Sequence, residues 1–283
     1  MTNAKTVSLI GAGNVGSALA FCLGNQGYQV SLFSRDTAQA VNRFANALEV
    51  TGLKNPANLV IRDYPASFEQ SDLVLFCVPD SAIEQTCDAL AEKFCGKEVV
   101  AHCSGALDSS VLNSAKKRGC LVASAHPYNT FPNLHNSLQV LADGHNSYLF
   151  CEGDDAALSI IMKIFQNLGF ITKSIEADRK VMYHTACVFA SNYLTLLMDM
   201  SMQTAKAANI DQQEFLTACQ PIIRATLGNL ETQSTKAALS GPLARGDMAT
   251  VKQHIDALST EAPELEKAYR VFADYAASLL ARD

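Results

Sequence analysis

The sequence has few charged residues, no basic run and no long uninterrupted apolar segment. Charged residues make up 18% of the chain and hydrophobic residues 48%, with a net charge of −6. An acidic chain without a basic cluster is a poor match for nucleic acid or for an anionic membrane surface. No stretch approaches about 18 consecutive apolar residues, and no charged-then-apolar leader opens the chain. We therefore expect a soluble, cytoplasmic protein with a sizeable core.

The nine cysteines form no C-x-x-C pair, and their number is odd. They are scattered over positions 22, 77, 87, 95, 103, 120, 151, 187 and 219. This pattern predicts reduced, mostly buried thiols and neither a structural disulfide nor a zinc site. His126, His135 and His145 could in principle converge on a metal, but their spacing does not place any two of them one helical turn apart. No metal site is expected.

A glycine-rich turn follows the first apolar run, Val7–Ile10, and matches G-x-G-x-x-G between a predicted strand and a predicted helix. In this motif the first glycine permits the tight turn, the second admits a pyrophosphate and the third lets the helix pack on the strand. Free N–H groups at the helix start suit a phosphate. The alternative is a plain strand–turn–helix, but the context favours dinucleotide binding. The candidate cofactor-binding residues are Gly11, Ala12, Gly13, Asn14, Val15 and Gly16.

Apolar runs and helical periodicity alternate along the first 176 residues. Strands are expected at 29–33, 59–62, 73–78, 98–102, 121–125, 148–151 and 169–174. The helix that begins near Thr37 is expected to bury Val41, Phe44, Ala45 and Leu48, which recur at helical spacing. This alternation predicts an α/β fold, a Rossmann-type doubly wound parallel sheet.

The strand pattern stops near Ala177, and the rest of the chain has helical periodicity. The segment 178–208 contains no proline and no glycine and is expected to form one helix of about 30 residues. A chain of 283 residues can hold roughly two domains. We predict an NAD(P)-binding Rossmann domain over 1–176 and an all-α substrate and dimerisation domain over 177–283.

The end of the second predicted strand indicates which dinucleotide binds. NAD-binding enzymes commonly place an acidic residue about 20 positions beyond the glycine turn, where it holds the ribose 2′-OH. Here Ser34 and Arg35 stand at the strand end, with Asp36 one position later. A hydroxyl and a guanidinium suit a 2′-phosphate. The alternative is a solvated Arg35 beside a helix-capping Asp36. The expected cofactor is NADP, with NAD as the alternative.

Polar residues follow the later predicted strands, at the carboxyl edge of the sheet where ligands bind in open α/β folds. We expect them to border the nicotinamide half of the cofactor. Asp80 has an equally good alternative as a helix N-cap, and Ser104 a weaker one as a turn residue. The residues concerned are Val78, Pro79, Asp80, Ser104, Gly105 and His126.

Polar residues also interrupt the apolar helix expected over 178–208. In a continuous helix Ser191 would lie close to the face of His184, with Asn192 on the same half. Such a stripe indicates a cavity or a partner, although a lone histidine on this face is commonly a core residue. Further on, Gly246 and Asp247 are expected to form a turn and an N-cap, which leaves Arg245 without a structural explanation.

These motifs together resemble the bacterial Rossmann-like NADP oxidoreductases whose C-terminal half is catalogued as a domain of unknown function. The wider superfamily includes pyrroline-5-carboxylate reductase, ketopantoate reductase and the β-hydroxyacid dehydrogenases. The resemblance implies a Rossmann domain, an all-α dimerisation domain and a substrate cleft between them. The hydroxyacid dehydrogenases carry a catalytic K-x-x-x-N on their long helix, and here His184 is expected to take that place without such a lysine. The motifs that carry the resemblance are the glycine turn and the segments 77–80, 102–105, 125–131, 183–184, 191–193 and 241–247.

The function predicted on this basis is an NADP-dependent oxidoreductase that transfers hydride to or from a small carbonyl or imine. His184 is expected to donate the proton, with Ser104, His126 and Asn192 as further catalytic residues. Ser191 and Arg245 would bind the substrate. The alternatives are a non-catalytic NADP-binding sensor and, more remotely, a scaffold dimer. The apolar surface of the C-terminal helices predicts a homodimer.

Overall fold

The computed structural model describes residues 6–142 and 147–282, so His145 lies outside the described residues. The chain forms two compact units, 1–188 and 189–283. The sequence placed a boundary near residue 176. The start of α7 (Lys180–Ala190) groups with the first unit because Lys180 is buried against it.

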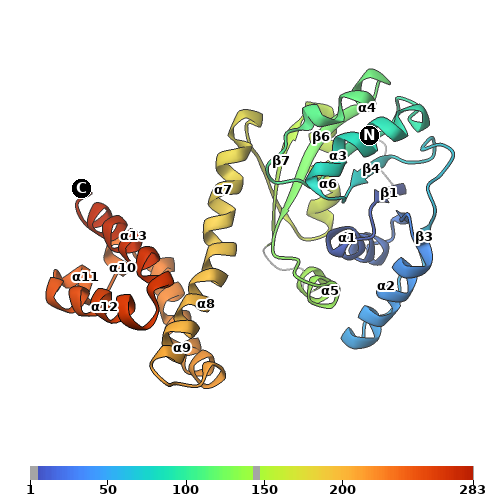
Figure 1. Cartoon of the computed structure of the whole chain (residues 1–283). Coiled ribbons are helices and arrows are strands. Elements are labelled where there is room, and N and C mark those ends of the chain that lie inside the picture. Colours follow the sequence, from blue (N-terminus) through green and yellow to red (C-terminus); the bar gives the residue numbers. More distant parts are fainter. Residues whose placement is uncertain (1–5, 143–146, 283) are drawn as a thin grey trace. The chain divides into compact units, whose positions relative to one another are not determined.

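One eight-stranded sheet forms the centre of the first unit, in the order β3-β2-β1-β4-β5-β6-β7-β8 (Figure 1). The doubly wound parallel sheet is confirmed for β1 to β6. β7 runs antiparallel to β6, and β8 runs parallel to β7. This reversal arises because β7 starts beside the residue where β6 ends, Tyr128 pairing with Tyr148. The strands are β1 (Thr6–Ile10), β2 (Gln29–Phe33), β3 (Leu59–Arg62), β4 (Leu73–Phe76), β5 (Val99–His102), β6 (Leu121–Tyr128), β7 (Tyr148–Gly153) and β8 (Ile171–Ser174).

Helices cover both faces of this sheet, and each face has its own buried apolar cluster. One cluster joins the sheet to α1, α2, α5 and α6, and the other joins it to α3 and α4. Both clusters contain residues of continuous apolar strands such as β4, as expected for parallel strands that are covered on two sides. The helices are α1 (Asn14–Asn25), α2 (Thr37–Thr51), α3 (Asp80–Leu90), α4 (Asn113–Lys117), α5 (Leu134–Ala142) and α6 (Asp155–Asn167).

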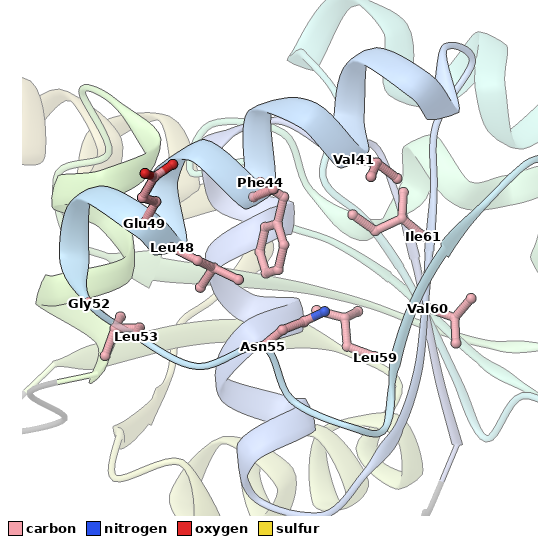
Figure 2. Close-up of a pocket in the computed structure, with 11 residues that line it drawn as sticks. Val41, Phe44, Leu48, Glu49, Gly52, Leu53, Asn55, Leu59, Val60 and Ile61 are labelled. Carbon is pink, nitrogen blue, oxygen red and sulfur yellow. The ribbon is translucent and has the colours of Figure 1, made fainter.

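Helix α2 buries a narrower face than the sequence predicts. Phe44 and Leu48 are buried, but Val41 is 43% exposed and Ala45 is exposed too. Figure 2 shows Val41 and Phe44 lining an open hollow between α2 and β3. Because β3 is the edge strand, the sheet offers no further strand to cover the outer part of this helix.

The described residues of the second unit form helices and turns, which confirms the all-α prediction. The single helix expected over 178–208 is wrong: α7 ends at Ala190, and Ser191 has φ −121° and ψ −68°, outside the helical region. Serine and asparagine compete for backbone hydrogen bonds, and they favour helix termini even where proline and glycine are absent. The helices are α8 (Asn192–Ala207), α9 (Gln212–Thr232), α10 (Thr235–Ala238), α11 (Gly241–Arg245), α12 (Met248–Glu261) and α13 (Pro263–Leu280).

Candidate functional site

The glycine turn between β1 and α1 fits its motif position by position. Gly11 has φ +108°, and a Cβ there would lie 2.7 Å from the carbonyl oxygen of Cys77. A Cβ on Gly16 would lie 2.0 Å from the carbonyl oxygen of Gly11. At Gly13 the nearest atom to such a Cβ is the Cys77 oxygen, at 3.8 Å. Two glycines are therefore required by the fold itself, and the third leaves room for a ligand.

The N-terminus of α1 presents backbone donors beside this turn. Its N-cap is Gly13, which has no side chain to accept from the first helical N–H groups. The Arg43 guanidinium, from α2, donates to the Ala12 carbonyl oxygen at 2.7 Å and holds the turn. Helix N-termini of this kind bind phosphate. The sequence analysis did not predict a role for Arg43. The only indication in the sequence was a basic residue two turns after the start of α2.

The residues expected to read the ribose lie where β2 ends. Asp36 caps α2 by accepting the Gln39 N–H at 2.9 Å, as the alternative interpretation supposed. Ser34 Oγ donates to the Asp36 carbonyl oxygen at 3.0 Å. Arg35 is exposed near Tyr64; burial raises the pKa of that phenol, and the Arg35 charge opposes the shift. The guanidinium is thus free of the cap and faces solvent.

A tight turn follows β5 and is organised by Ser104, which is 5% exposed. Its Oγ donates to Asp80 Oδ2 at 2.7 Å and accepts the N–H groups of Ala106 and Leu107 at 3.2 and 3.0 Å. Asp80 lies in the first turn of α3, whose N-cap is Pro79. The N-cap alternative for Asp80 is therefore wrong, since its carboxylate serves the Ser104 turn.

His102 supports the same turn from inside the sheet, where it is fully buried. Its Nε2–H donates to the Asp108 carbonyl oxygen at 3.0 Å, and its Nδ1 accepts the Ser104 N–H at 3.2 Å. Burial lowers the pKa of His102 to about 4. A neutral imidazole with both nitrogens in use is a structural element of the turn.

Two further histidines meet over Gly105, at the end of β6 and the start of α7. The rings of His126 and His184 lie 5.9 Å apart and nearly perpendicular. A Cβ on Gly105 would lie 2.4 Å from His184 Cδ2 and 3.0 Å from His126 Nε2, so only glycine fits beneath the pair. Tyr183 Oη lies 2.7 Å from His126 Nδ1, and the imidazole tautomer decides which atom donates. The structure therefore brings together Ser104, His126 and His184.

The electrostatic surroundings keep His126 and Tyr183 uncharged near neutral pH. Burial lowers the pKa of His126 to about 4, and the charges of Lys180 and His184 act in the same direction, against Asp80. Burial raises the pKa of Tyr183, which stays a phenol. A neutral histidine held by a phenol can accept or pass a proton without carrying a charge beforehand.

The lysine that the sequence analysis took to be absent is present. Lys180 precedes His184 by four residues, so the helix carries K-x-x-x-H, and this spacing was the signal that was overlooked. The side chain is 1% exposed. Its Nζ donates to the Ser104 carbonyl oxygen at 3.0 Å and to Ser124 Oγ.

Three predicted site residues belong to the second unit. Ser191 lies at the N-cap of α8, Asn192 is its exposed first residue, and Arg245 is the exposed last residue of α11. The turn at Gly246, with φ +70°, and the Asp247 cap of α12 are confirmed. The catalytic and substrate-binding roles of the first three residues remain predictions.

The cysteines form no disulfide among the described residues. The cysteines are free, and five of the nine are buried. The Sγ atoms of Cys77 and Cys103, at the ends of β4 and β5, lie 3.6 Å apart. Within residues 6–142 and 147–282, no group of three or more His, Cys, Asp and Glu side chains could hold a metal ion. In the same residues, no helix combines the length and apolarity needed to cross a bilayer.

Two family matches divide the chain. Residues 6–116 match the NAD-dependent glycerol-3-phosphate dehydrogenase N-terminus, and residues 147–276 match the domain of unknown function DUF2520. The chain is similar to glycerol-3-phosphate dehydrogenase (NAD(P)+) of Pseudomonas syringae pv. tomato, with 33% identity over 110 residues, or 37% of this chain. The match spans 32% of that protein's length. These matches confirm an NAD(P)-binding domain and a second domain of the resembled kind.

Solved structures with the same fold cover nearly the whole chain. A candidate NADP oxidoreductase from Bacteroides fragilis has 19% identity and a TM-score of 0.76, with 99% of each chain covered. A reductive aminase from Aspergillus terreus, in complex with NADPH and ethyl-5-oxohexanoate, has 16% identity and a TM-score of 0.67, over 98% of this chain and 94% of its own. Identities this low show a shared fold, which confirms the predicted fold class.

Proposed function

The chain joins an NAD(P)-binding Rossmann domain to a DUF2520 domain, and on this premise we propose that it is an NADP-dependent oxidoreductase acting on a small carbonyl or imine. The observation that carries the proposal is the packing of His126 and His184 against each other above Gly105. This pair lies at the carboxyl end of β6, on the edge of the sheet where dinucleotides bind. The complex of the reductive aminase with NADPH and a keto ester supports this substrate class.

The residues of the first unit divide the work between binding and proton transfer. The glycine turn and the N-terminus of α1 hold the pyrophosphate, and Ser34 with Arg35 holds a 2′-phosphate. NADPH, when bound, supplies the hydride. Reduction of a carbonyl leaves negative charge on its oxygen, so a proton donor must wait there. His184 is that donor, and His126, fixed by Tyr183, faces it.

The second unit contributes substrate contacts in this proposal. Asn192 and Ser191 offer an amide and a hydroxyl that can hold a carbonyl or amine group. Arg245 offers a guanidinium for a carboxylate, which would favour keto acids over plain ketones. The exposure of Asn192 and Arg245 leaves both side chains available for such contacts.

Oxidation of NADPH in the presence of small ketones, keto acids and cyclic imines tests the proposal. We expect turnover with at least one class, followed by loss of NADPH absorbance and by product mass. The alternative, a non-catalytic sensor, makes the opposite prediction: tight NADPH binding with no turnover for any class. Calorimetry with NADPH on the same protein separates a sensor from a chain that binds no dinucleotide.

Arg35→Ala is expected to weaken NADPH binding selectively. The variant removes a charge-assisted contact to the 2′-phosphate, worth about 1.5–3 kcal/mol, or roughly 10- to 150-fold in Kd. NADH has no 2′-phosphate, so its affinity should barely change. Calorimetry with both dinucleotides measures the ratio. Equal affinity of the unaltered protein for NADPH and NADH would show that Ser34 and Arg35 do not select the cofactor.

We further propose that the protein forms a homodimer through its C-terminal helices. The buried apolar residues of the second unit are mostly small, and many large ones are exposed. Exposed apolar surface on this scale is typical of a two-fold interface. The most exposed large apolar residues of the second unit are Phe189, Leu196, Ile222, Met248, Val271 and Tyr275.

Light scattering at micromolar concentration measures this directly. We expect a mass of twice 30.4 kDa. Ile222→Glu places a charge on the proposed interface and should shift the protein toward monomer. Val60→Glu, on the exposed part of β3, is the matched control and should leave the mass unchanged. A monomeric mass for the unaltered protein would contradict the proposal.

A further inference from the structure

Among the described residues, Lys180 is the one buried lysine, and its burial carries a desolvation cost. An ammonium group taken out of water is costly unless it is paired. In the described part of the chain, no carboxylate lies within ion-pair distance of it. Burial lowers its pKa, and the more distant charges of Glu152, Asp108 and Asp80 oppose that shift. A group kept in such a position usually has a functional reason.

The contacts of Lys180 converge on one backbone atom. Its Nζ donates to the Ser104 carbonyl oxygen at 3.0 Å, and Ser124 Oγ donates to the same oxygen at 3.3 Å. Lys180 also donates to Ser124 Oγ, so the three groups form a closed triangle. Ser124 is fully buried on β6, next but one to His126. The triangle therefore ties α7, β6 and the turn after β5 together.

That turn determines the spacing of the histidine pair. Gly105 follows Ser104 directly, and a Cβ on it would collide with His184 and press on His126. A shift of this turn would either press it against the two rings or open a gap beneath them. Catalytic geometry tolerates displacements of only about 0.5 Å.

We propose that Lys180 is a positioning residue that holds the Ser104–Gly105 turn beneath His126 and His184. This inference rests on the proposed function only in assigning the turn to a catalytic site. Lys180 contacts the Ser104 carbonyl oxygen of the turn, and the residue is 1% exposed. It acts on the reaction through the turn and through its charge.

The positive charge of Lys180 affects the pKa of His126, which packing alone would not do. His126 is faced by Lys180, His184 and Tyr183 from α7, and by Asp80 from α3. Lys180 and His184 lower the pKa of His126, in addition to burial, and Asp80 raises it. Removal of the ammonium charge should therefore raise the pKa of His126, whereas a cavity of the same size elsewhere should not.

Lys180→Met keeps most of the length of the side chain and removes the charge and both hydrogen bonds of Nζ. We expect the His126 pKa, followed by the NMR titration of its ring protons, to rise by about one unit or more. Hydrogen exchange at Ala106 and Leu107 should accelerate at least tenfold, because Lys180 no longer holds the carbonyl group of Ser104, the residue whose Oγ accepts their N–H groups. Lys163→Met, an exposed change on α6, is the matched control and should alter neither.

Ser124→Ala provides a second route if the methionine variant does not fold. It keeps the charge and removes two of the three hydrogen bonds of the triangle, so exchange at Ala106 and Leu107 should accelerate while the His126 titration stays unchanged. Unaltered exchange in both variants, or in the one that folds, overturns the proposal. The His126 titration and the hydrogen exchange can both be measured without a substrate, so this test does not depend on finding turnover.

Discussion

A His184→Gln variant is expected to lose about 10²–10⁴-fold in kcat, the usual contribution of a general acid. Glutamine keeps a polar group of similar reach but cannot titrate, so it removes proton donation and little else. His184 lies 5.9 Å from the His126 ring and directly above Gly105, so its removal acts at the centre of the candidate site. The glycine turn is untouched, and NADPH affinity should stay the same.

The measurement pairs a turnover assay with NADPH calorimetry and a melting curve. His254→Gln is the matched control: this histidine is exposed in the second unit, where it bonds Tyr269, and its loss should leave kcat unchanged. An unchanged kcat with a lowered Tm for His184→Gln would assign His184 a structural role in place of a catalytic one.

Between pH 6.5 and about pH 4 the protein is expected to lose stability steeply. His102 is buried and His126 is half-buried, and burial lowers the pKa of each from 6.5 to about 4. In that window the unfolded chain binds protons that the folded chain does not, so falling pH favours unfolding. A depression of this size corresponds to roughly 3 kcal/mol for each histidine. Two such groups consume a large part of a typical stability of about 5–15 kcal/mol.

Urea unfolding at a series of pH values between 7 and 4 tests this expectation. The carboxyl of Glu152 opposes the trend, because burial raises its pKa and protonation then favours the folded state. Asp108, whose pKa Ser110 lowers through hydrogen bonds, adds to the loss below about pH 4. His102→Asn should flatten the pH dependence. A stability that stays constant from pH 6.5 to 4 would contradict the burial of the neutral imidazoles.

Several features of both units follow from local rules that are visible in the sequence. The glycine turn, the apolar strands and the Asp247 cap depend on short-range chemistry, and the structure confirms each of them. The reversal at β7 could not be predicted in this way. It depends on where α5 returns the chain to the sheet, a long-range outcome with no residue pattern of its own.

The sequence predicted which strand ends carry the candidate site, but not the hydrogen-bond network that connects its residues. Topology explains why Ser104 and His126 come together, since β5 and β6 are neighbours. The triangle around Lys180 was not found because a lysine in a helical stretch ordinarily signals solvent. The predicted burial of Val41 was wrong for the opposite reason. Its spacing is that of a core residue, but α2 packs on the edge strand β3, and Val41 remains exposed.

The antiparallel pairing of β6 with β7 has a consequence for any attempt to divide the protein. The DUF2520 match begins at residue 147, so a fragment cut there keeps β7 and leaves β6 behind. Six residues of β7, Tyr148–Gly153, would present unpaired backbone groups along one edge, an invitation to self-association. Lys180 would go with the fragment without Ser104 and Ser124, as a cation stripped of its acceptors. Cleavage between Ala190 and Asn192, by contrast, would sever a single helical junction and leave the sheet whole.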